Sequence, residues 1–489
     1  MDSLPVLIPI SLLLFALLSF LAGTIRKSFA FPVALTGIIC SLTASVLGLI
    51  RVLQSGPQHY YLGGWAPPLG IEYVLDHLSA FMAVIITIIA LLSVIYSYKS
   101  FLQELPERIV HLYSLMLLLL AGLVGIVVTG DLFNLYVFLE IASLAAYGVL
   151  AVGNDKALVA VFRYIIIGTL GACFYLLGVG FIYFATGTLN MADAAAIIPN
   201  IEQSRLIVLA AAFIVIGMAL KMALFPLHIW LPDVYTYSPA GVITLIAPLM
   251  TKVGAYVVIR MLISVFPISY LSDSLPITLI IGWLAAIGII VMSVMAIAQK
   301  DFRRMLAYSS LAQICYVALG IGLANPLGII GALLHILNHA FMKGCLFQIS
   351  GAVSYRTGLW QINQFAGLGS RMSWTMVAFT IAAVSMVGIP PACGFFSKWY
   401  LVLGSVDAGN WVFAVVILIS SLLNAVYFFR LLENIYMKPS TENIAVSNAK
   451  DPPAAMLIPI LLLASGIIIL GIFNAVIVTQ VLEPIALSL

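Results

Sequence analysis

The stretch KMALFPLHIWLPDVYTYSPAGVITLIAPLMTKVGA, residues 221–255, decides how this chain folds. Lys221 and Lys252 stand near its two ends in otherwise apolar sequence, and Pro226, Pro232 and Pro239 interrupt the helical pattern between them. A charged side chain near the middle of a bilayer is costly, so it usually faces a partner, a water-filled cavity or an ion path. Broken backbone survives at that depth only where protein or water covers its polar groups. The stretch therefore predicts an ion path inside a membrane.

The composition of the whole chain agrees with that prediction. Of its 489 residues, 63% are hydrophobic and 8% are charged, whereas soluble domains are about 25% charged. Apolar runs of about 20 residues, the length that crosses a bilayer, recur along the chain. We therefore predict an all-α polytopic membrane protein with about 14 transmembrane helices, the first of them retained rather than cleaved as a signal peptide. The expected spans are residues 4–25, 31–53, 76–98, 109–130, 131–152, 157–186, 204–231, 239–266, 276–299, 304–324, 326–355, 372–407 (broken), 410–437 and 455–480.

Two proline-broken spans indicate an internal symmetry. One break, at Pro226, follows Lys221, and the other, at Pro390 and Pro391, precedes Lys398. Interrupted segments at corresponding places in two halves are typical of transporters built from inverted repeats. We therefore expect four regions: residues 1–108, with three helices and an outward hairpin loop; 109–266, the first five-helix repeat; 276–437, the second; and 455–489, the last helix.

The short loops predict the orientation, because cytoplasmic loops carry the excess of Lys and Arg. Even-numbered loops hold only Arg51 and Arg205, so both termini are expected on the outer side of the cell membrane. The net charge of +3 is dispersed, which does not suggest nucleic-acid binding. The odd-numbered loops hold Arg26, Lys27, Lys99, Arg108, Lys156, Lys300, Arg303, Arg304, Arg356, Arg371, Lys438 and Lys450.

Glu140 is predicted to lie close to mid-membrane, because it follows Asp131, the expected helix start, by nine residues. A lysine from another span would lower the cost of burying it, and Lys221 is the candidate. A purely structural ion pair is the alternative, although buried pairs stabilise poorly compared with apolar packing.

The buried lysines suit proton transfer. Burial lowers the proton affinity of a lysine and a nearby carboxylate restores it, so Lys221, Lys252 and Lys398 could each respond to a neighbour's movement. Their side chains could therefore carry protons across the membrane interior.

His335, His339 and Lys343 follow at i, i+4 and i+8 and share one helix face. Further metal ligands are missing nearby, and the five cysteines have no C-x-x-C spacing, so we expect no metal site and interpret the column as part of a proton wire. A histidine in a satisfied core is the alternative for either His alone.

Other polar residues have less specific interpretations. His228 either lines the same wet region near the break or caps freed backbone groups. Long side chains near helix ends can reach the membrane interface, and solvated loop positions explain Asp131 and Asp233. The residues expected to reach the interface are Arg163, Arg260, Arg430 and Glu433.

Seven motifs together resemble one family, the antiporter-like membrane subunits. This group includes the D subunit of Mrp-type multisubunit sodium/proton antiporters, the three antiporter-like subunits of respiratory complex I, and counterparts in membrane-bound hydrogenases. The chain length, TGDLFN and GTLNMAD favour the Mrp D subunit within it. The motifs are TGDLFNLYVFLEI around Glu140, FATGTLNMADAA around Asn190, KMALFPLHIWLPD from Lys221, LMTKVGAY around Lys252, RRMLAYSSLAQ from Arg303, HILNHAFMKG from His335 and GFFSKW around Lys398.

The resemblance implies fourteen helices with two inverted five-helix repeats and a polar axis in the membrane plane. By motif, Glu140 and Lys221 would form a pair, Lys252 would be the central lysine and Lys398 the terminal one, with the histidine column connecting them. The chain is too short for the long lateral helix of one complex I subunit or for the extra domains of the large Mrp subunit.

These observations predict a proton-translocating subunit of a multisubunit complex, most simply a sodium/proton antiporter of the Mrp type. A proton-pumping subunit of a complex I-type oxidoreductase or a membrane-bound hydrogenase is the alternative, and a non-conducting scaffold is the rival from a different class. The expected partners are other membrane subunits, protons and Na+. We expect no cofactor and no catalytic chemistry, since the chain lacks the nucleophile or metal cluster of a membrane enzyme.

Overall fold

The computed structural model describes residues 3–201, 204–266, 276–438 and 444–487. The chain is almost entirely helical, and thirteen helices of the described part are long and apolar enough to cross a membrane. With the broken pair α15 and α16 they account for the fourteen predicted spans. The long helices are α1 (Leu4–Ile25), α2 (Ala30–Ser55), α3 (His77–Glu104), α4 (Ile109–Val128), α5 (Leu132–Leu150), α6 (Asp155–Thr186), α8 (Arg205–Met222), α10 (Ala240–Ser264), α11 (Ile277–Ile297), α12 (Phe302–Gly322), α13 (Pro326–Thr357), α17 (Trp411–Leu432) and α19 (Ala454–Ile472).

Shorter elements connect these helices. A hairpin of two antiparallel strands confirms the hairpin predicted after the second span, pairing Gln58 with Leu75 and Tyr61 with Glu72. The short elements are β1 (Gln58–Tyr61), β2 (Glu72–Leu75), α7 (Met191–Ile197), α9 (Leu231–Tyr237), α14 (Leu368–Arg371), α15 (Ser373–Val387), α16 (Cys393–Asp407), α18 (Ile444–Ser447), α20 (Asn474–Ile477) and α21 (Glu483–Ala486), with single turns of 3-10 helix at Lys27–Phe29, Leu62–Gly64, Ile198–Asn200 and Ile362–Gln364 and π-helix at Glu433–Met437 and Val478–Leu482.

Both predicted breaks are present, and both are built in the same way. Helix α8 is followed by Ala223, whose φ is 59°, and α15 is followed by Gly388, whose φ is 95°. The next residue donates its N–H to a carbonyl five positions back, from Leu224 to Ala219 and from Ile389 to Val384. This is the bond of a Schellman cap, which satisfies a carbonyl left free at a helix end. The first of these two broken helices, α8, therefore ends before Pro226, although the predicted span continued to residue 231.

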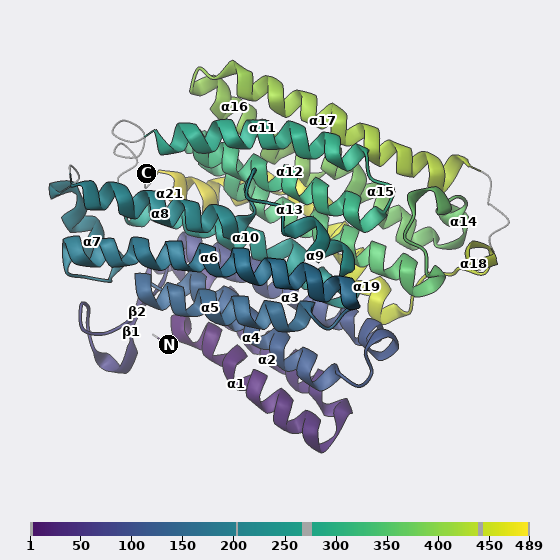
Figure 1. Cartoon of the computed structure of the whole chain (residues 1–489), viewed down its shortest axis with the longest axis horizontal. Helices are drawn as coiled ribbons and strands as arrows, with labels where there is room; N and C mark the ends of the chain where they lie inside the picture. Colours follow the sequence, from purple (N-terminus) through teal and green to yellow (C-terminus); the bar gives the residue numbers. More distant parts are fainter. Residues whose placement is uncertain (1–2, 202–203, 267–275, 439–443, 488–489) are drawn as a thin grey trace.

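Helices α10, α12 and α13 form the centre of the bundle (Figure 1). The stretches of α10 and α13 that are long enough to cross a membrane are completely buried inside the protein, and that of α12 is 94% buried. Helices α1 and α2 cover one side, and α16 and α17 cover the opposite side (Figure 1). Two of these helices, α10 and α13, hold Lys252, His335, His339 and Lys343, so these four groups lie where neither lipid nor bulk water surrounds them.

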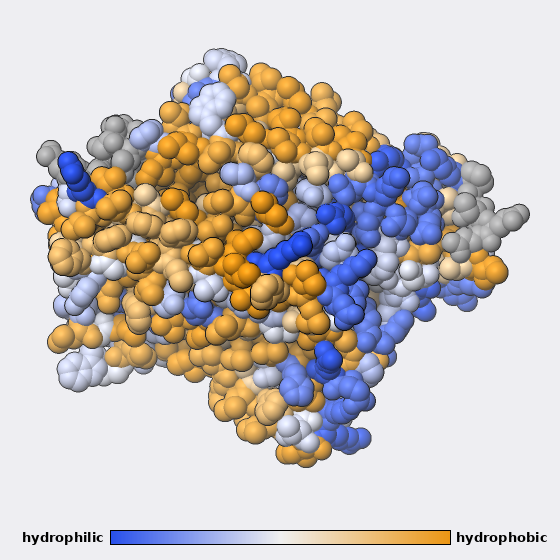
Figure 2. Space-filling view, viewed as in Figure 1, coloured by the Kyte–Doolittle hydropathy of each residue, from blue (hydrophilic) through white to orange (hydrophobic). Residues whose placement is uncertain are grey.

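The outer surface is divided by polarity. Hydrophobic residues cover most of the visible face, whereas hydrophilic residues gather at the right-hand end, near α14 and α18 (Figure 2). The long helices run across the same view (Figure 1). An apolar belt crossed by helices and bounded by a charged end is the surface expected of a polytopic membrane protein.

Candidate functional site

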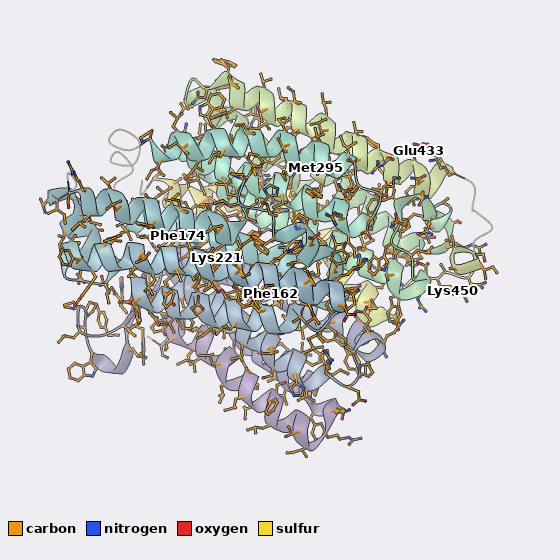
Figure 3. The ribbon with its side chains drawn as sticks, viewed as in Figure 1. Phe162, Phe174, Lys221, Met295, Glu433 and Lys450 are labelled. Carbon is orange, nitrogen blue, oxygen red and sulfur yellow. The ribbon has the colours of Figure 1, made fainter. Side chains whose placement is uncertain are left out.

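The first buried lysine lies at the end of the first broken helix. Lys221 occupies the last turn of α8, is 6% exposed, and lies near the middle of the bundle's width (Figure 3). Its Nζ donates to the Oγ of Ser143 on α5 at 2.8 Å. A cavity of about 20 Å³ lies against both residues, which is room for about one water molecule.

The predicted Glu140–Lys221 ion pair is not closed. The side chain of Lys221 is directed to Ser143, and no ion pair between the described residues joins it to Glu140. The Glu140 charge nevertheless acts on Lys221. Glu140 is half-buried and precedes Ser143 by three positions, so the two share one side of α5 and lie about 4.5 Å apart along its axis. A short movement of the Lys221 side chain would therefore exchange one partner for the other.

Lys252 lies in the centre of the bundle beside a proline in α10. Pro248 has no N–H, so the carbonyl of Thr244 loses its helical donor, and the Ser93 hydroxyl of α3 donates to it instead at 2.8 Å. The ammonium of Lys252 donates to the Ala247 carbonyl at 2.7 Å and is 1% exposed. The proline thus opens the helix next to the only lysine of α10.

The histidine column is buried as predicted, and its two rings differ in their partners. His335 and His339 are stacked with their centroids 5.8 Å apart. His335 Nδ1 lies 2.9 Å from the Ser397 hydroxyl of α16. Neither ring nitrogen of His339 has a protein partner, and buried nitrogens of this kind are ordinarily satisfied by ordered water. The column therefore contains buried polar nitrogens that no protein group satisfies.

Lys343 follows the histidines on the same face of α13. Its Nζ donates to the Ser309 hydroxyl of α12 at 2.8 Å and to the Leu306 carbonyl at 3.2 Å. Lys252 lies on α10, which packs against α13. The central lysine therefore lies on a direct neighbour of the helix that carries the histidine column and Lys343.

Lys398 uses the second break as its binding site. Its Nζ donates to the carbonyls of Met386 and Val387 at 2.9 and 3.0 Å, and to the Ser421 hydroxyl at 3.1 Å. These carbonyls belong to the end of α15, where the helix dipole favours a cation. The nitrogen also lies 5.4 Å from the ring centre of Tyr316. The broken helix thus holds an ammonium without a carboxylate.

Together the named groups form a row from α5 and α8 through α10 and α13 to α16. The structure buries six of the predicted residues on these neighbouring helices, and it places Glu140 on α5, one turn from the hydroxyl that binds Lys221. His228 lies in the turn between α8 and α9, half-buried and stacked on Phe225 with centroids 5.6 Å apart. It marks the break rather than joining the row. The six residues in the row are Lys221, Lys252, His335, His339, Lys343 and Lys398.

Sequence reasoning missed the hydroxyl groups that bind the lysines. Ser143, Ser309 and Ser421 each accept from an ammonium, and Ser397 contacts a histidine. Serine is common in membrane helices and can bond its own backbone. No pattern in the sequence distinguishes these four from the other serines.

The prediction for Arg260 was wrong. It is buried rather than extended to the interface, and its NH1 and NH2 groups donate to the two carboxylate oxygens of Asp76 at 2.5 and 2.9 Å. Burial opposes ionisation of Asp76, but Arg260 and Ser79 outweigh it and hold the pKa of Asp76 well below its usual range. This pair joins the start of α3 to α10. Its geometry is fixed strongly, because the Arg–carboxylate bonds are bidentate.

A polar cavity opens at one end of the bundle. It measures about 400 Å³ and is lined by Glu104, Ser238, Arg303 and Ser354 among others. Ser350, one turn from Ser354 on α13, has a buried hydroxyl without a protein partner. Both serines fall on the helix face that carries Lys343. The cavity therefore lies at the end of the helix face that carries Lys343.

The fold and this row of buried amines define a polytopic antiporter-like membrane protein. The profile described as "NADH:quinone oxidoreductase/Mrp antiporter, TM" matches residues 129–424, and the chain belongs to this family, Proton_antipo_M.

The chain is similar to two subunits of known complexes and to a chain of one solved structure. The N subunit of the NADH-quinone oxidoreductase of Desulforudis audaxviator is 46% identical over 98% of both chains. The D subunit of the Na(+)/H(+) antiporter of Alkalihalophilus pseudofirmus is 31% identical over 98% of this chain and 97% of its own. A chain of the membrane-bound sulfane sulfur reductase, an archaeal respiratory membrane complex, superposes with a TM-score of 0.91 at 31% identity, over 98% of this chain and 96% of that chain. The predicted preference for the Mrp type over the complex I type is therefore not favoured, because the oxidoreductase relative is the more similar of the two in sequence.

Proposed function

We propose that this chain translocates protons as an antiporter-like subunit of a respiratory, redox-driven membrane complex of the NADH-quinone oxidoreductase type. One observation carries the proposal: five buried side chains on neighbouring helices, four lysines and one histidine, contact hydroxyls and carbonyls instead of carboxylates. An ammonium buried without a counter-ion is costly. Groups of this kind that can lose a proton are suited to carrying it.

The first step is a change of partner at Lys221. In the structure it donates to Ser143, which is the open arrangement of the Glu140–Lys221 pair. When the ammonium moves to Glu140, the carboxylate favours the protonated form; when it moves back, that support is lost and the proton is released toward Lys252. Movement elsewhere in the complex would set which arrangement is occupied.

The proton then passes along the row. The polar nitrogens of His339 and the hydroxyl of Ser350 are positions where water would complete the path. The cavity lined by Glu104 and Arg303 supplies access from one face. Lys398, bound at the second break, is the terminal carrier. We place both termini on the outer side of the membrane, and other membrane subunits of the complex as partners.

A second candidate is monovalent cation/proton antiport, which the 31% identity to a chain of a Na(+)/H(+) antiporter supports. The two candidates differ in driving force. In inverted vesicles holding the whole native complex, an electron donor whose oxidation reduces quinone should drive proton uptake in the absence of Na+. Lys221→Ala should abolish this uptake. Lys450→Ala, a surface change, should leave it intact. Proton movement driven only by a sodium gradient would replace the redox assignment with antiport. Assembled complex that moves no protons under either condition would favour the scaffold.

A further inference from the structure

A chain of hydrogen bonds leaves Lys343 on the side away from the histidines. The Lys343 ammonium donates to Ser309 Oγ at 2.8 Å, and this hydroxyl lies 2.8 Å from the Tyr427 hydroxyl of α17. Tyr427 in turn donates to Asn424 Oδ1 at 2.7 Å. Ser309, Tyr427 and Asn424 are completely buried, so bulk water does not compete for these bonds.

The same chain ends at the carbonyl that binds Lys398. Asn424 Nδ2 donates to the Met386 carbonyl at 3.4 Å, and Lys398 Nζ donates to that carbonyl at 2.9 Å. One carbonyl therefore serves both the amide of Asn424 and the ammonium of Lys398. Two lysines of the row are joined through α17 without using either histidine.

The direction of these bonds depends on the proton of Lys343. An ammonium has three donors and no acceptor, so a protonated Lys343 obliges Ser309 to direct its hydrogen to Tyr427. The tyrosine hydrogen then points to Asn424. A neutral amine has a lone pair, which allows Ser309 to turn toward Lys343 and Tyr427 to turn toward Ser309. Asn424 Oδ1 then loses its donor.

We propose that Tyr427 and Asn424 form a relay that reports the protonation state of Lys343 to Lys398. While Lys343 is protonated, the relay holds the Asn424 amide against the Met386 carbonyl, which Lys398 must share. When Lys343 loses its proton the amide is released, and the carbonyl binds the Lys398 ammonium alone. The loss of a proton at one lysine thereby favours a proton at the other.

No bond to carbon changes in this step, and each hydroxyl keeps one hydrogen throughout. The transported proton leaves the Lys343 ammonium along the row, while the relay only reorients. Tyr427 is therefore a positioning residue. The other titratable groups facing the two lysines are Lys252, His339, His335 and Tyr316. The inference rests on the proposed proton transport.

The test uses the native complex with Tyr427→Phe, compared with Tyr175→Phe. Tyr175 is equally buried and donates to the Leu132 carbonyl at 3.1 Å, far from the relay in sequence. Loss of one buried hydrogen bond to a charged network is expected to lower proton transport about tenfold in Tyr427→Phe. The control should lose little.

A spectroscopic measurement distinguishes a Tyr427 that reports the protonation state of Lys343 from one that only stabilises the structure. In infrared difference spectra with ¹³C-labelled tyrosine, titration of the row should shift a tyrosine band that disappears in both Tyr427→Phe and Lys343→Met. Asn424→Ala should keep that shift but lose transport, because the relay is cut beyond the tyrosine. A Tyr427→Phe complex as active as the control, or a band that still shifts in Lys343→Met, would overturn the relay. Intact transport in Lys221→Ala would instead overturn the proposed function.

Discussion

Lys221 donates to Ser143 at 2.8 Å and not to Glu140, one turn earlier on the same helix. A charge-assisted hydrogen bond is stronger than a neutral one. The buried ammonium of Lys221 has few other groups to bind. The hydroxyl therefore defines the position of the lysine in this structure, and in the proposed switch the Glu140 carboxylate defines the second position.

Ser143→Ala should remove the open position and leave Lys221 held by Glu140. Loss of a hydrogen bond to a charged group costs about 1.5–3 kcal/mol, so proton transport should fall at least tenfold. Ser143→Thr keeps the hydroxyl and should retain most of the activity. Equal rates for the alanine and threonine variants, measured in the assembled complex, would show that the hydroxyl has no part in the switch.

Lys398→Arg should be as inactive as Lys398→Met. Arginine keeps the positive charge that the carbonyls of Met386 and Val387 bind, but it does not release its proton under physiological conditions. Transport by vesicles at matched complex content checks this. Substantial transport by the arginine variant would mean that position 398 supplies charge rather than a mobile proton.

The Asp76–Arg260 pair should support stability rather than transport. Breaking a buried pair by Arg260→Ala leaves an uncompensated carboxylate and is expected to cost about 3 kcal/mol, whereas Asp76→Asn combined with Arg260→Met should cost less. The apparent melting temperature of the purified complex measures both. A melting temperature unchanged in Arg260→Ala would contradict the buried geometry.

The same pair gives a pH dependence. The pKa of Asp76 is lowered by folding, so its contribution is fully present above the unfolded value of about 3.9 and is lost as pH falls through the lower folded value. The melting temperature should therefore fall below about pH 4, and this part of the fall should be absent in Asp76→Asn. The difference between the two profiles, rather than either alone, is the relevant measurement.

The polar cavity predicts a direction of access. Ser354 lines it and Ser350 lies deeper on the same helix face. In a complex without reactive surface thiols, a membrane-impermeant thiol reagent should react with Ser354→Cys from the face that carries the loops rich in Lys and Arg. It should react with Ser350→Cys more slowly, and from that face only. Labelling of Ser350→Cys from the opposite face would place the access route on the other side.

Much of the fold could be predicted because each span had to be a long apolar run, and both broken helices carried prolines. The lysines and histidines of the row were identifiable for a similar reason: charge is rare in lipid. The partners of these groups were not. Ser143 and Tyr427 resemble many other residues, and only the packing of α5 and α17 brings them to Lys221 and Ser309. Arg260 was misjudged because Asp76 lies far away in sequence.

In the proposed function the buried lysines act in series on one path. Substituting them singly by methionine, which keeps the length and removes the proton, tests it in the assembled complex driven by its own substrate. We expect Lys221→Met, Lys252→Met, Lys343→Met and Lys398→Met each to abolish proton uptake, whereas the surface variant Lys450→Met should not. Undiminished uptake in any one of the four, with the complex intact, would contradict a single path.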